Sequence, residues 1–576
     1  MTLRARIISS CILLALALAA FPHSYSGFES SNELSHLYLA VSIVNYRSVS
    51  IDKTMTTWGD IVDKSARKGC FYSDKAPGAS WLAIFPAILL KTVSAASGVS
   101  FNRDEALIIA RIMAVMLPCF IFFVFLPGRL SLFQSGTGRP IPISEGGTLI
   151  RPAENTAFTI ALAYAFGTQA WVYSTLLYSH QLAAVTLFAA YMLLRPSPDR
   201  AEKLGAREMC AGLLSGFSIA LDYPAAWAVL CMIVYVSRRG GAARRGWFWA
   251  GLLIPVATLM AYNWKAFGGP FTTGYSFKAY SRDAAVHARG ILGIRWPSAA
   301  SLHGILASRS RGLFFYSPWL IFALPGFFRM ARLKHLMADF ALCLAVVSGH
   351  TLLIGSFGDW PAGWSYGPRH LTPMLPFLLP ALVVELEAAK RYERLLIACL
   401  LAISVTTTAM AVATFPHVPT LLDNPVTDLF IALIRAGDVG PLVGGIDSWV
   451  SLAVMVVLII AAILWFCIEA GKKHGPSWTI VISIVSVLAA MVWIFSMSHI
   501  PPQESAEKHF AMSQVYAAFK DDASSYRELE PLTIPSQPID LRIYATFMLW
   551  KTAEDMKDAP GAAKWRKEYE FMLNQK

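Results

Sequence analysis

The feature that most constrains this chain is a series of thirteen long apolar segments. They lie at roughly 7–23, 106–126, 155–176, 179–195, 208–221, 224–237, 247–263, 313–328, 336–354, 372–388, 395–415, 448–468 and 478–498. A helix needs about 20 mostly apolar residues to cross a membrane. We therefore expect an all-α polytopic membrane domain with about 13 transmembrane helices over residues 1–498. A small, mostly helical tail is expected over residues 499–576.

The composition supports this interpretation. Only 15% of the 576 residues are charged, whereas 55% are hydrophobic. Soluble domains carry about 25% charged residues, so this composition excludes an ordinary soluble enzyme. A net charge of +12 on a soluble chain would suggest a nucleic-acid partner. Basic cytoplasmic loops explain the charge better here, and we expect no nucleic-acid partner.

Lysine and arginine are distributed unevenly between the two sides of the membrane. The N-terminus and six alternate loops hold 21 of them, whereas the four short loops on the other side hold only Arg369 and Arg435. Positive charge marks the cytoplasmic side. The N-terminus is therefore expected in the cytoplasm and the C-terminal tail outside it, in the plasma (inner) membrane. Counting segment 81–97 as a span would invert this pattern, so we expect an interfacial or re-entrant helix there.

The first apolar segment admits two interpretations. Basic residues before it and small residues within it are typical of a cleaved signal peptide. However, its A-x-A triplets lie inside the apolar run, and Phe21–Pro22 interrupts the expected cleavage site, which favours an uncleaved anchor. Seven of the eight cysteines lie in apolar segments, so neither a disulfide framework nor a CxxC metal site is expected.

Three longer outer loops are expected at 24–105, 264–312 and 355–371, and the candidate functional residues lie in the first and third of them and in two short outer turns. In the first, Leu34, Leu37, Tyr38 and Val41 recur at helical spacing, which places Glu33 in the first turn of a juxtamembrane helix. A carboxylate at the water–lipid boundary can serve as a general base. The alternative is that Asn32 and Glu33 only stabilise the helix N-terminus.

Lys75 follows in the same loop and is expected at the depth of the lipid headgroups. Lysine binds phosphate as a point charge, but an interfacial lysine can also extend to the headgroups with no further role. The turns at 173–181 and 222–224 add His180 and Asp222, each of which is a candidate site residue or a structural one.

The loop at 355–371 combines aromatic and charged side chains. Trp364 offers a flat face for a sugar ring, and Arg369 offers a planar fork for phosphate. Asp359 and His370 flank them. The alternative is an interfacial aromatic belt.

No nucleotide-binding fingerprint is present, and no His, Asp or Glu cluster has the sequence spacing of metal ligands. We therefore expect no metal and no cofactor, although a divalent metal stays possible. Chemistry at the outer face without nucleotides requires an activated donor that is already in the membrane.

Five segments resemble a known family. They are SNELSHLYLAVSIV, YSDKAPGASWLAIFP, GTQAWVYSTLLYSHQLAA, RGLFFYSPWLIFALPGF and GWSYGPRHLTPMLPFLLP, in this order over residues 1–400. They resemble the GT-C superfamily of polyprenyl-phosphate-sugar glycosyltransferases, in the branch of the protein O-mannosyltransferases and the lipid A aminoarabinose transferase. Residues 400–576 carry no such resemblance.

The resemblance implies roles for Glu33 and Lys75, and the chemistry of the other candidate residues suggests theirs. Glu33 would activate the acceptor, with Asn32 where many relatives have Asp, and Lys75 would contact the donor phosphate together with Arg369. Many relatives have a second acidic residue in the turn at 173–181. Here His180 stands there instead, and Asp222 or Asp359 could replace the missing carboxylate. Further substrate contacts would come from Tyr72, Trp364 and His370.

The expected function is transfer of a sugar from a polyprenyl-phosphate donor, by direct displacement, to a protein, lipid or polysaccharide acceptor at the extracytoplasmic face. Membrane lipid is a further partner. Two alternatives stay open: a lipid-linked glycan transporter or flippase, and a non-catalytic envelope assembly protein. A flippase would have ionisable residues deep in its spans, whereas Arg111, Asp339 and Glu385 lie near span ends.

Overall fold

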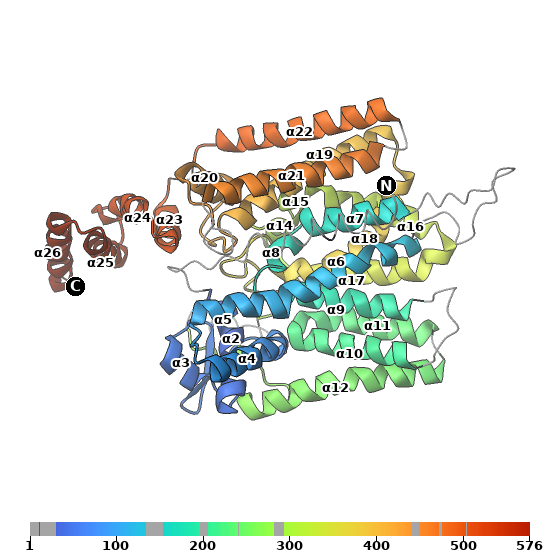
Figure 1. Cartoon of the computed structure of the whole chain (residues 1–576), viewed down its shortest axis with the longest axis horizontal. Coiled ribbons are helices and arrows are strands. Elements are labelled where there is room, and N and C mark those ends of the chain that lie inside the picture. Colours follow the sequence, from blue (N-terminus) through green and yellow to red (C-terminus); the bar gives the residue numbers. More distant parts are fainter. Residues whose placement is uncertain are drawn as a thin grey trace.

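A computed structural model describes residues 30–133, 154–195, 205–239, 241–280, 293–440, 448–471, 475–502 and 504–575, together with Cys11. The expected anchor at 7–23 lies outside these residues apart from Cys11. Helices dominate the described part, and they run side by side in a bundle (Figure 1).

The bundle helices after the first loop are α5 (Arg103–Ala110), η1 (Arg111–Met116), α6 (Leu117–Leu130), η2 (Ser131–Phe133), α7 (Glu154–Phe166), α8 (Ala170–Tyr173), α9 (Ser179–Leu194), α10 (Ala206–Leu221), η3 (Tyr223–Ala225), α11 (Ala226–Arg239), α12 (Ala242–Phe267), η4 (Gly274–Phe277), α14 (Ala299–Leu306), α15 (Leu313–Tyr316), η5 (Pro318–Phe322), α16 (Ala323–Ala331), η6 (Lys334–Leu336), α17 (Met337–Gly355), η7 (Arg369–Leu378), α18 (Leu379–Ala388), α19 (Arg391–Ala413), η8 (Val426–Ile431), α20 (Ala432–Ala436), α21 (Ser448–Gly471) and α22 (Pro476–Ser498).

The expected all-α polytopic architecture is confirmed. Each expected apolar segment after the first coincides with one or more of these helices. Among the described residues, seven helical stretches are long and apolar enough to cross a membrane: Gly78–Ser97, Arg103–Phe133, Lys334–Gly355, Arg369–Ala388, Arg391–Ala413, Leu452–Glu469 and Pro476–Ser498. Shorter apolar helices lie at Thr156–Phe166, at Ser179–Leu194, which is α9, and at Pro318–Ala331. The neighbouring α10 and α11 have 16 and 14 residues. The total of 13 spans stays a prediction.

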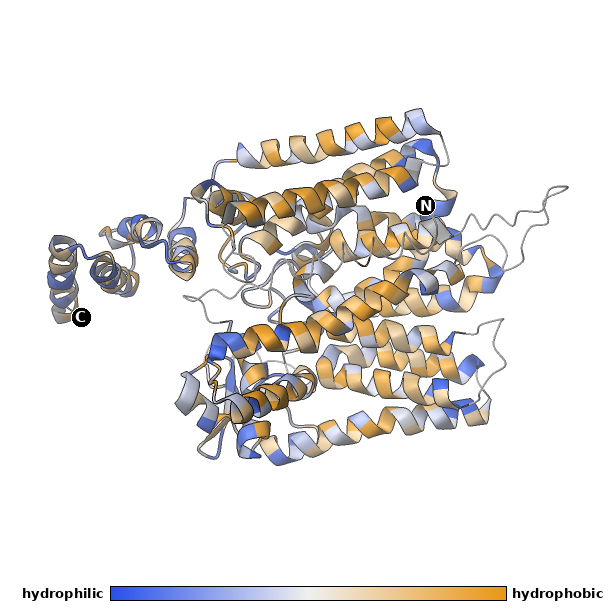
Figure 2. Cartoon of the chain, viewed as in Figure 1, coloured by the Kyte–Doolittle hydropathy of each residue, from blue (hydrophilic) through white to orange (hydrophobic). Residues whose placement is uncertain are grey.

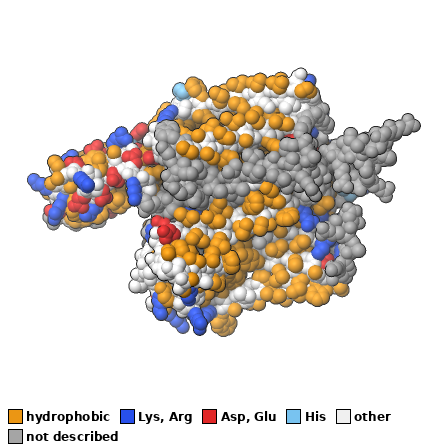
Figure 3. Space-filling model, in the orientation of Figure 1, with side chains coloured by type: hydrophobic (Ala, Val, Ile, Leu, Met, Phe, Trp, Pro, Cys, Tyr) orange, Lys and Arg blue, Asp and Glu red, His pale blue; other side chains and the backbone are white. Residues whose placement is uncertain are grey.

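Hydropathy follows the helix axes. Figure 2 shows apolar residues along the bundle and hydrophilic residues at its two ends. In the space-filling view, hydrophobic side chains cover the visible sides of the bundle, and Lys, Arg, Asp and Glu gather at its ends and on the tail (Figure 3). On helix α22, the side chains of Val492 and Phe495 are 62% and 64% exposed. Such faces suit contact with lipid.

One end of the bundle holds the first expected outer loop, and we call it the loop end. It is formed by α2 (Ser31–Tyr46), α3 (Asp52–Trp58), the strands β1 (Lys64–Arg67) and β2 (Cys70–Ser73), and α4 (Gly78–Ser97), which lie together there (Figure 1). The antiparallel hairpin turns at Lys68 and Gly69, both with positive φ, as the tight turn of a two-residue hairpin requires. The hairpin therefore brings Asp63, just before β1, close to Lys75, shortly after β2.

Helix α4 is longer than the ten apolar residues expected at this position. By length and composition it could cross a membrane. However, α5 starts only a few residues after α4 ends, and both helices lie beside α2 at the loop end (Figure 1). This arrangement favours the expected interfacial or re-entrant helix, with Pro86 inside it.

Glycines bring α10 and α12 into close contact. A Cβ at Gly212 would lie 2.1 Å from the Phe248 carbonyl oxygen, and one at Gly251 would lie 2.1 Å from that of Met209. Small residues at such positions let two membrane helices approach backbone to backbone. At the loop end of α10, a Cβ at Gly78 would meet the Ala220 carbonyl oxygen at 2.6 Å. The start of α4 is therefore packed on the end of α10.

The tail is helical, as expected. It contains α23 (Ala506–Phe519), α24 (Asp522–Leu529), η10 (Glu530–Thr533), α25 (Ile539–Asp555) and α26 (Ala559–Gln575). Helix α23 joins the main core, and its last residue Phe519 lies 6.1 Å from Phe415, ring centroid to ring centroid. The following helices enclose a small separate core that includes Leu532, Leu549 and Trp565. The tail extends from the loop end (Figure 1).

Candidate active site

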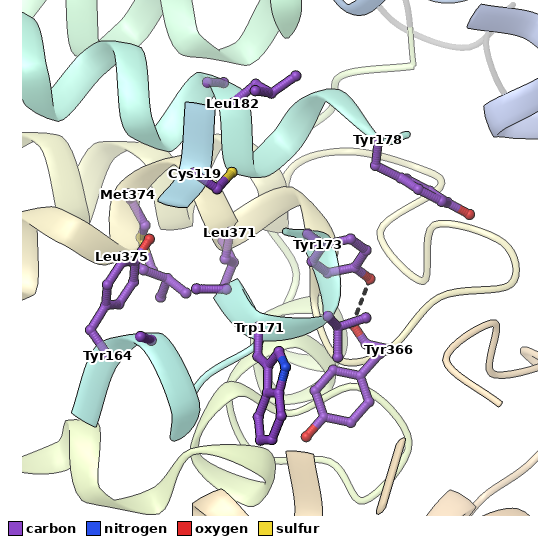
Figure 4. Close-up of a cluster of buried hydrophobic side chains, with 14 of the residues drawn as sticks. Cys119, Tyr164, Trp171, Tyr173, Tyr178, Leu182, Tyr366, Leu371, Met374 and Leu375 are labelled. Atoms are coloured by element: carbon purple, nitrogen blue, oxygen red, sulfur yellow. Dashed lines mark hydrogen bonds between the residues drawn. The ribbon is translucent and has the colours of Figure 1, made fainter. Parts of the chain in front are cut away.

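The loop before η7 is held by buried polar side chains from two other segments. Arg311 donates hydrogen bonds to the carbonyl oxygens of Pro361 (3.1 Å) and Gly363 (3.1 Å). Gln169 Nε2 donates to Thr372 Oγ1 at 2.7 Å. The Tyr173 hydroxyl donates to the Tyr366 carbonyl oxygen at 2.7 Å, within a cluster of buried aromatic and aliphatic side chains (Figure 4). These contacts fix the backbone on both sides of Arg369.

A second set of contacts joins the first loop to the segment after α12. Ser65 Oγ donates to the Gly274 carbonyl oxygen at 2.7 Å, and the Ala279 amide donates to the Lys64 carbonyl oxygen at 3.0 Å. A Cβ at Gly274 would lie 2.8 Å from Asp74 Cα. Only glycine allows this approach, which brings Lys278 to Asp74.

Five charged residues lie together at the loop end, and we call them the charge cluster: Asp63, Asp74, Lys75, Lys278 and Arg369. Lys75 Nζ lies 2.9 Å from Asp63 Oδ2 and 3.4 Å from Asp74 Oδ2, and Lys278 Nζ lies 3.4 Å from the same Asp74 oxygen. Burial lowers the pKa of Lys75, but Asp63 and Asp74 outweigh this effect, so its pKa lies above the usual value. Lys75 is therefore charged at neutral pH.

Arg369 lies close enough to this group to act on the pKa values of Asp63 and Lys75. Its Cζ stands 5.4 Å from the centroid of the Tyr178 ring. Its buried Nε has no hydrogen-bond partner among the described residues. A buried donor without a protein partner is rare, and such a donor is usually satisfied by a water molecule, an ion or a ligand. The charges of Lys75 and Arg369 thus act on each other, and their shared role at a donor phosphate stays a prediction.

Next to Arg369, three residues from separate helices form a compact set, which we call the His–Asp–His group: His180, Asp222 and His370. His180 Nδ1 and Asp222 Oδ2 are hydrogen-bonded at 2.9 Å. The rings of His180 and His370 meet edge to face, with centroids 5.0 Å apart. His180 thus pairs with Asp222, one of the two carboxylates expected to replace the missing acidic residue.

Glu33 differs from the sequence expectation. It was expected at the water–lipid boundary, but its exposure is 0%. Its two carboxylate oxygens accept hydrogen bonds from Arg111 Nε (2.7 Å) and Nη2 (2.6 Å), and Oε1 also accepts one from the Leu177 amide (2.6 Å). Burial raises the pKa of Glu33, but Arg111, His417 and the Leu177 amide together bring it below the usual range.

The geometry thus does not support Glu33 as the base that activates the acceptor. A long side-chain partner from η1 occupies both oxygens, and the nearest further group is His417, with Nε2 3.7 Å from Oε2. Burial lowers the pKa of His417 to about 4, so that imidazole is neutral. Glu33 instead fixes α2 against the turn before α9 and against the π-helical segment η1.

The remaining candidate residues belong to neither the charge cluster nor the His–Asp–His group. Asn32 is half-buried in the first turn of α2. Tyr72 packs on Phe267, with ring centroids 5.8 Å apart, and no described contact joins it to the charge cluster. Trp364 packs edge-on against Phe415 at 6.2 Å. Asp359 affects the pKa values of Arg311 and Arg369.

Sequence reasoning missed several members of the site. Asp63 and Asp74 precede Lys75 in the same loop, and Lys278 is one of the basic residues of the loop at 264–312. Their role depends on the pairing of that loop with the hairpin, which the sequence pattern does not reveal. Arg111 was recognised only as an ionisable residue near the end of a span.

Acidification is expected to destabilise the loop end. Asp63 and Glu33 both have pKa values below the usual range, because Lys75 and Arg111 outweigh the effect of burial. Such carboxylates stabilise the folded state fully above their unfolded pKa of about 4, and this contribution is lost as the pH falls through the folded pKa. Thermal melting in detergent should therefore show a Tm that is level above about pH 5 and falls as the pH drops below about 4. An Asp63→Asn variant with the same slope as the wild type would contradict this assignment.

Together, the fold and the site define a multi-pass helical membrane protein with a buried cationic site at one end of its bundle. No family model matches the chain, and no curated protein matches it. Two solved structures are similar: ArnT from Cupriavidus metallidurans bound to undecaprenyl phosphate, and the same protein in the apo state, with TM-scores of 0.48 and 0.44. Each match has 12% identity and covers 93% of this chain and 81% of the ArnT chain. ArnT is a GT-C lipid A aminoarabinose transferase, which is the class that the sequence motifs resemble.

Proposed function

We propose that this protein is a membrane glycosyltransferase of the GT-C type. It transfers a sugar from a polyprenyl-phosphate donor to an acceptor hydroxyl at the extracytoplasmic face. The observation that carries the proposal is Arg369, a cation beside Lys75 whose buried Nε has no hydrogen-bond partner among the described residues. Such a pair suits the phosphate of a lipid carrier at the end of a membrane bundle.

The charge balance supports an anionic ligand. Within the charge cluster itself, three cations face two carboxylates, while Asp359 outside the cluster also acts on Arg369. Burial lowers the pKa values of the nearby His36 and His417 to about 3 and about 4, so neither adds charge at neutral pH. An anion that binds beside Arg369 would neutralise the remaining positive charge of the cluster.

In the proposed reaction, the acceptor oxygen attacks the anomeric carbon while the bond from that carbon to the phosphate oxygen breaks. The phosphate leaves with the bonding electrons, and Arg369 and Lys75 stabilise its developing charge. The acceptor proton passes to water at the outer face, and the His–Asp–His group beside Arg369 orients the acceptor hydroxyl. Glu33 is a positioning residue, since it holds α2 in place through Arg111.

This proposal places the loop end and the tail on the extracytoplasmic side. The basic loops that follow α9, α11, α16 and α18 then face the cytoplasm. The proposal does not assign the sugar, the chain length of the lipid or the acceptor, and the first experiment is designed to identify the donor.

The test uses the purified full-length protein in liposomes with a panel of polyprenyl-phosphate sugars labelled in the sugar. An envelope extract serves as the acceptor. We expect one donor to lose its label to the extract, with release of the polyprenyl phosphate. Heat-denatured protein is the control. Movement of an intact donor across the bilayer without transfer would instead identify a flippase, and no change in any donor would contradict the proposal.

A further inference from the structure

The His–Asp–His group combines side chains that are far apart in the sequence. His180 lies in the first turn of α9, Asp222 ends α10 with an extended backbone (φ −150°, ψ 113°), and His370 lies in the first turn of η7. One ligand atom from each residue lies within 4.8 Å of the other two. The spacing along the sequence does not indicate metal ligands, because three separate helices contribute these residues.

We propose that His180, Asp222 and His370 form a binding site for a divalent transition metal ion of the zinc class. Two imidazoles and one carboxylate are a donor set of three-ligand zinc sites, which keep a fourth position open. Tetrahedral zinc, with bonds of about 2.1 Å, sets its ligand atoms about 3.4 Å apart. His180 Nδ1 and Asp222 Oδ2 are already 2.9 Å apart, so small side-chain rotations complete the set.

An independent observation supports a ligand at this place. His370 Nδ1 is buried and has no hydrogen-bond partner among the described residues. The backbone of His370 is held from behind, because His350 Nε2 donates to its carbonyl oxygen at 2.8 Å. Metal-binding histidines are commonly fixed by such surrounding hydrogen bonds. The backbone of His370 is thus anchored, and its ring packs edge to face on His180 with an Nδ1 that has no partner among the described residues.

The surrounding charges select the kind of metal. The charges of Arg369 and Lys75 act on His180, that of Arg369 acts on His370, and the group itself contains one carboxylate, Asp222. Calcium and magnesium depend on several oxygen ligands and bind poorly to such a set. Imidazole nitrogen binds zinc, copper and nickel more strongly, which offsets the repulsion from Arg369. The site therefore favours a transition metal.

The test measures metal binding directly and needs no activity, so its result is independent of the proposed function. The tag-free, chelator-treated full-length protein in detergent is titrated with zinc chloride by calorimetry, and with cobalt chloride by visible absorption. We expect binding of zinc at this site and the absorption bands of four-coordinate cobalt. Loss of a ligand should weaken binding more than about 100-fold, beyond the effect of removing a surrounding partner.

The key variant is Asp222→Asn, which keeps the shape of the side chain and its hydrogen-bonding capacity towards His180. His370→Ala is the second variant, and Asp359→Asn and His335→Asn are matched controls outside the group. Monodispersity and thermal melting without metal report whether each variant is folded. Retention of the cobalt bands and of zinc affinity in folded Asp222→Asn and His370→Ala would overturn the proposal. A wild-type protein that binds neither metal would also overturn it.

Discussion

Replacing Arg369 by glutamine is expected to lower the rate of sugar transfer by about 10²–10³-fold, the usual cost of removing one charge-stabilising donor. The reason is that the leaving phosphate gains charge in the transition state, and the Arg369 guanidinium is the cation whose Nε has no partner among the described residues. Since the surrounding loop is held by Arg311, Gln169 and Tyr173, the fold should survive the change. The measurement is the initial transfer rate in liposomes at saturating donor.

The matched control for this prediction is Arg309→Gln. Arg309 is an exposed arginine in the expected outer loop at 264–312. Its replacement should leave transfer within about twofold of the wild type, since an exposed surface charge contributes little. Equal rates for Arg369→Gln and Arg309→Gln would remove Arg369 from the proposed site.

The second large effect concerns stability. Arg111→Leu is expected to cost about 3–5 kcal/mol, because it leaves the Glu33 carboxylate charged and buried without its partner. The double variant Glu33→Gln with Arg111→Leu should recover much of this loss, since no uncompensated charge remains. Thermal or denaturant unfolding in detergent measures both changes.

The control for this pair is Arg103→Leu on the neighbouring α5. The Arg103–Asp104 pair is partly exposed, with Nε and Oδ1 3.4 Å apart. Its loss should cost at most about 1 kcal/mol. If Arg111→Leu were as mild as this control, the ion pair would not hold α2 in place.

Periodicity and composition predicted the architecture well, because long apolar runs have few alternatives to membrane helices. They also singled out Lys75, Arg369, His180 and Asp222, which the structure brings to one end of the bundle. The position of Glu33 was predicted wrongly. A helical pattern shows which face of α2 is apolar, but it does not show that Arg111, from a helix further along the chain, covers the carboxylate.

The same limit explains why the His–Asp–His group and the charge cluster were not foreseen. The charge cluster depends on the close approach at Gly274, which carries no chemical signal in the sequence, and the His–Asp–His group depends on the meeting of α9, α10 and η7. Gly274 allows the loop after α12 to reach Asp74, and Gly78 allows α4 to rest on the end of α10. Only the backbone approach at these glycines reveals which polar residues become neighbours.

The short helices around the site have a consequence for the bilayer. With 16 residues, α9 and α10 each extend about 24 Å, which is less than the hydrocarbon thickness of about 30 Å. A membrane that meets such helices thins locally, and thinning draws the phosphate plane inward, towards His180 and Asp222 at their ends. The protein would thus shape the leaflet that delivers its own donor, and the acyl-chain length of the surrounding lipids becomes a determinant of catalysis.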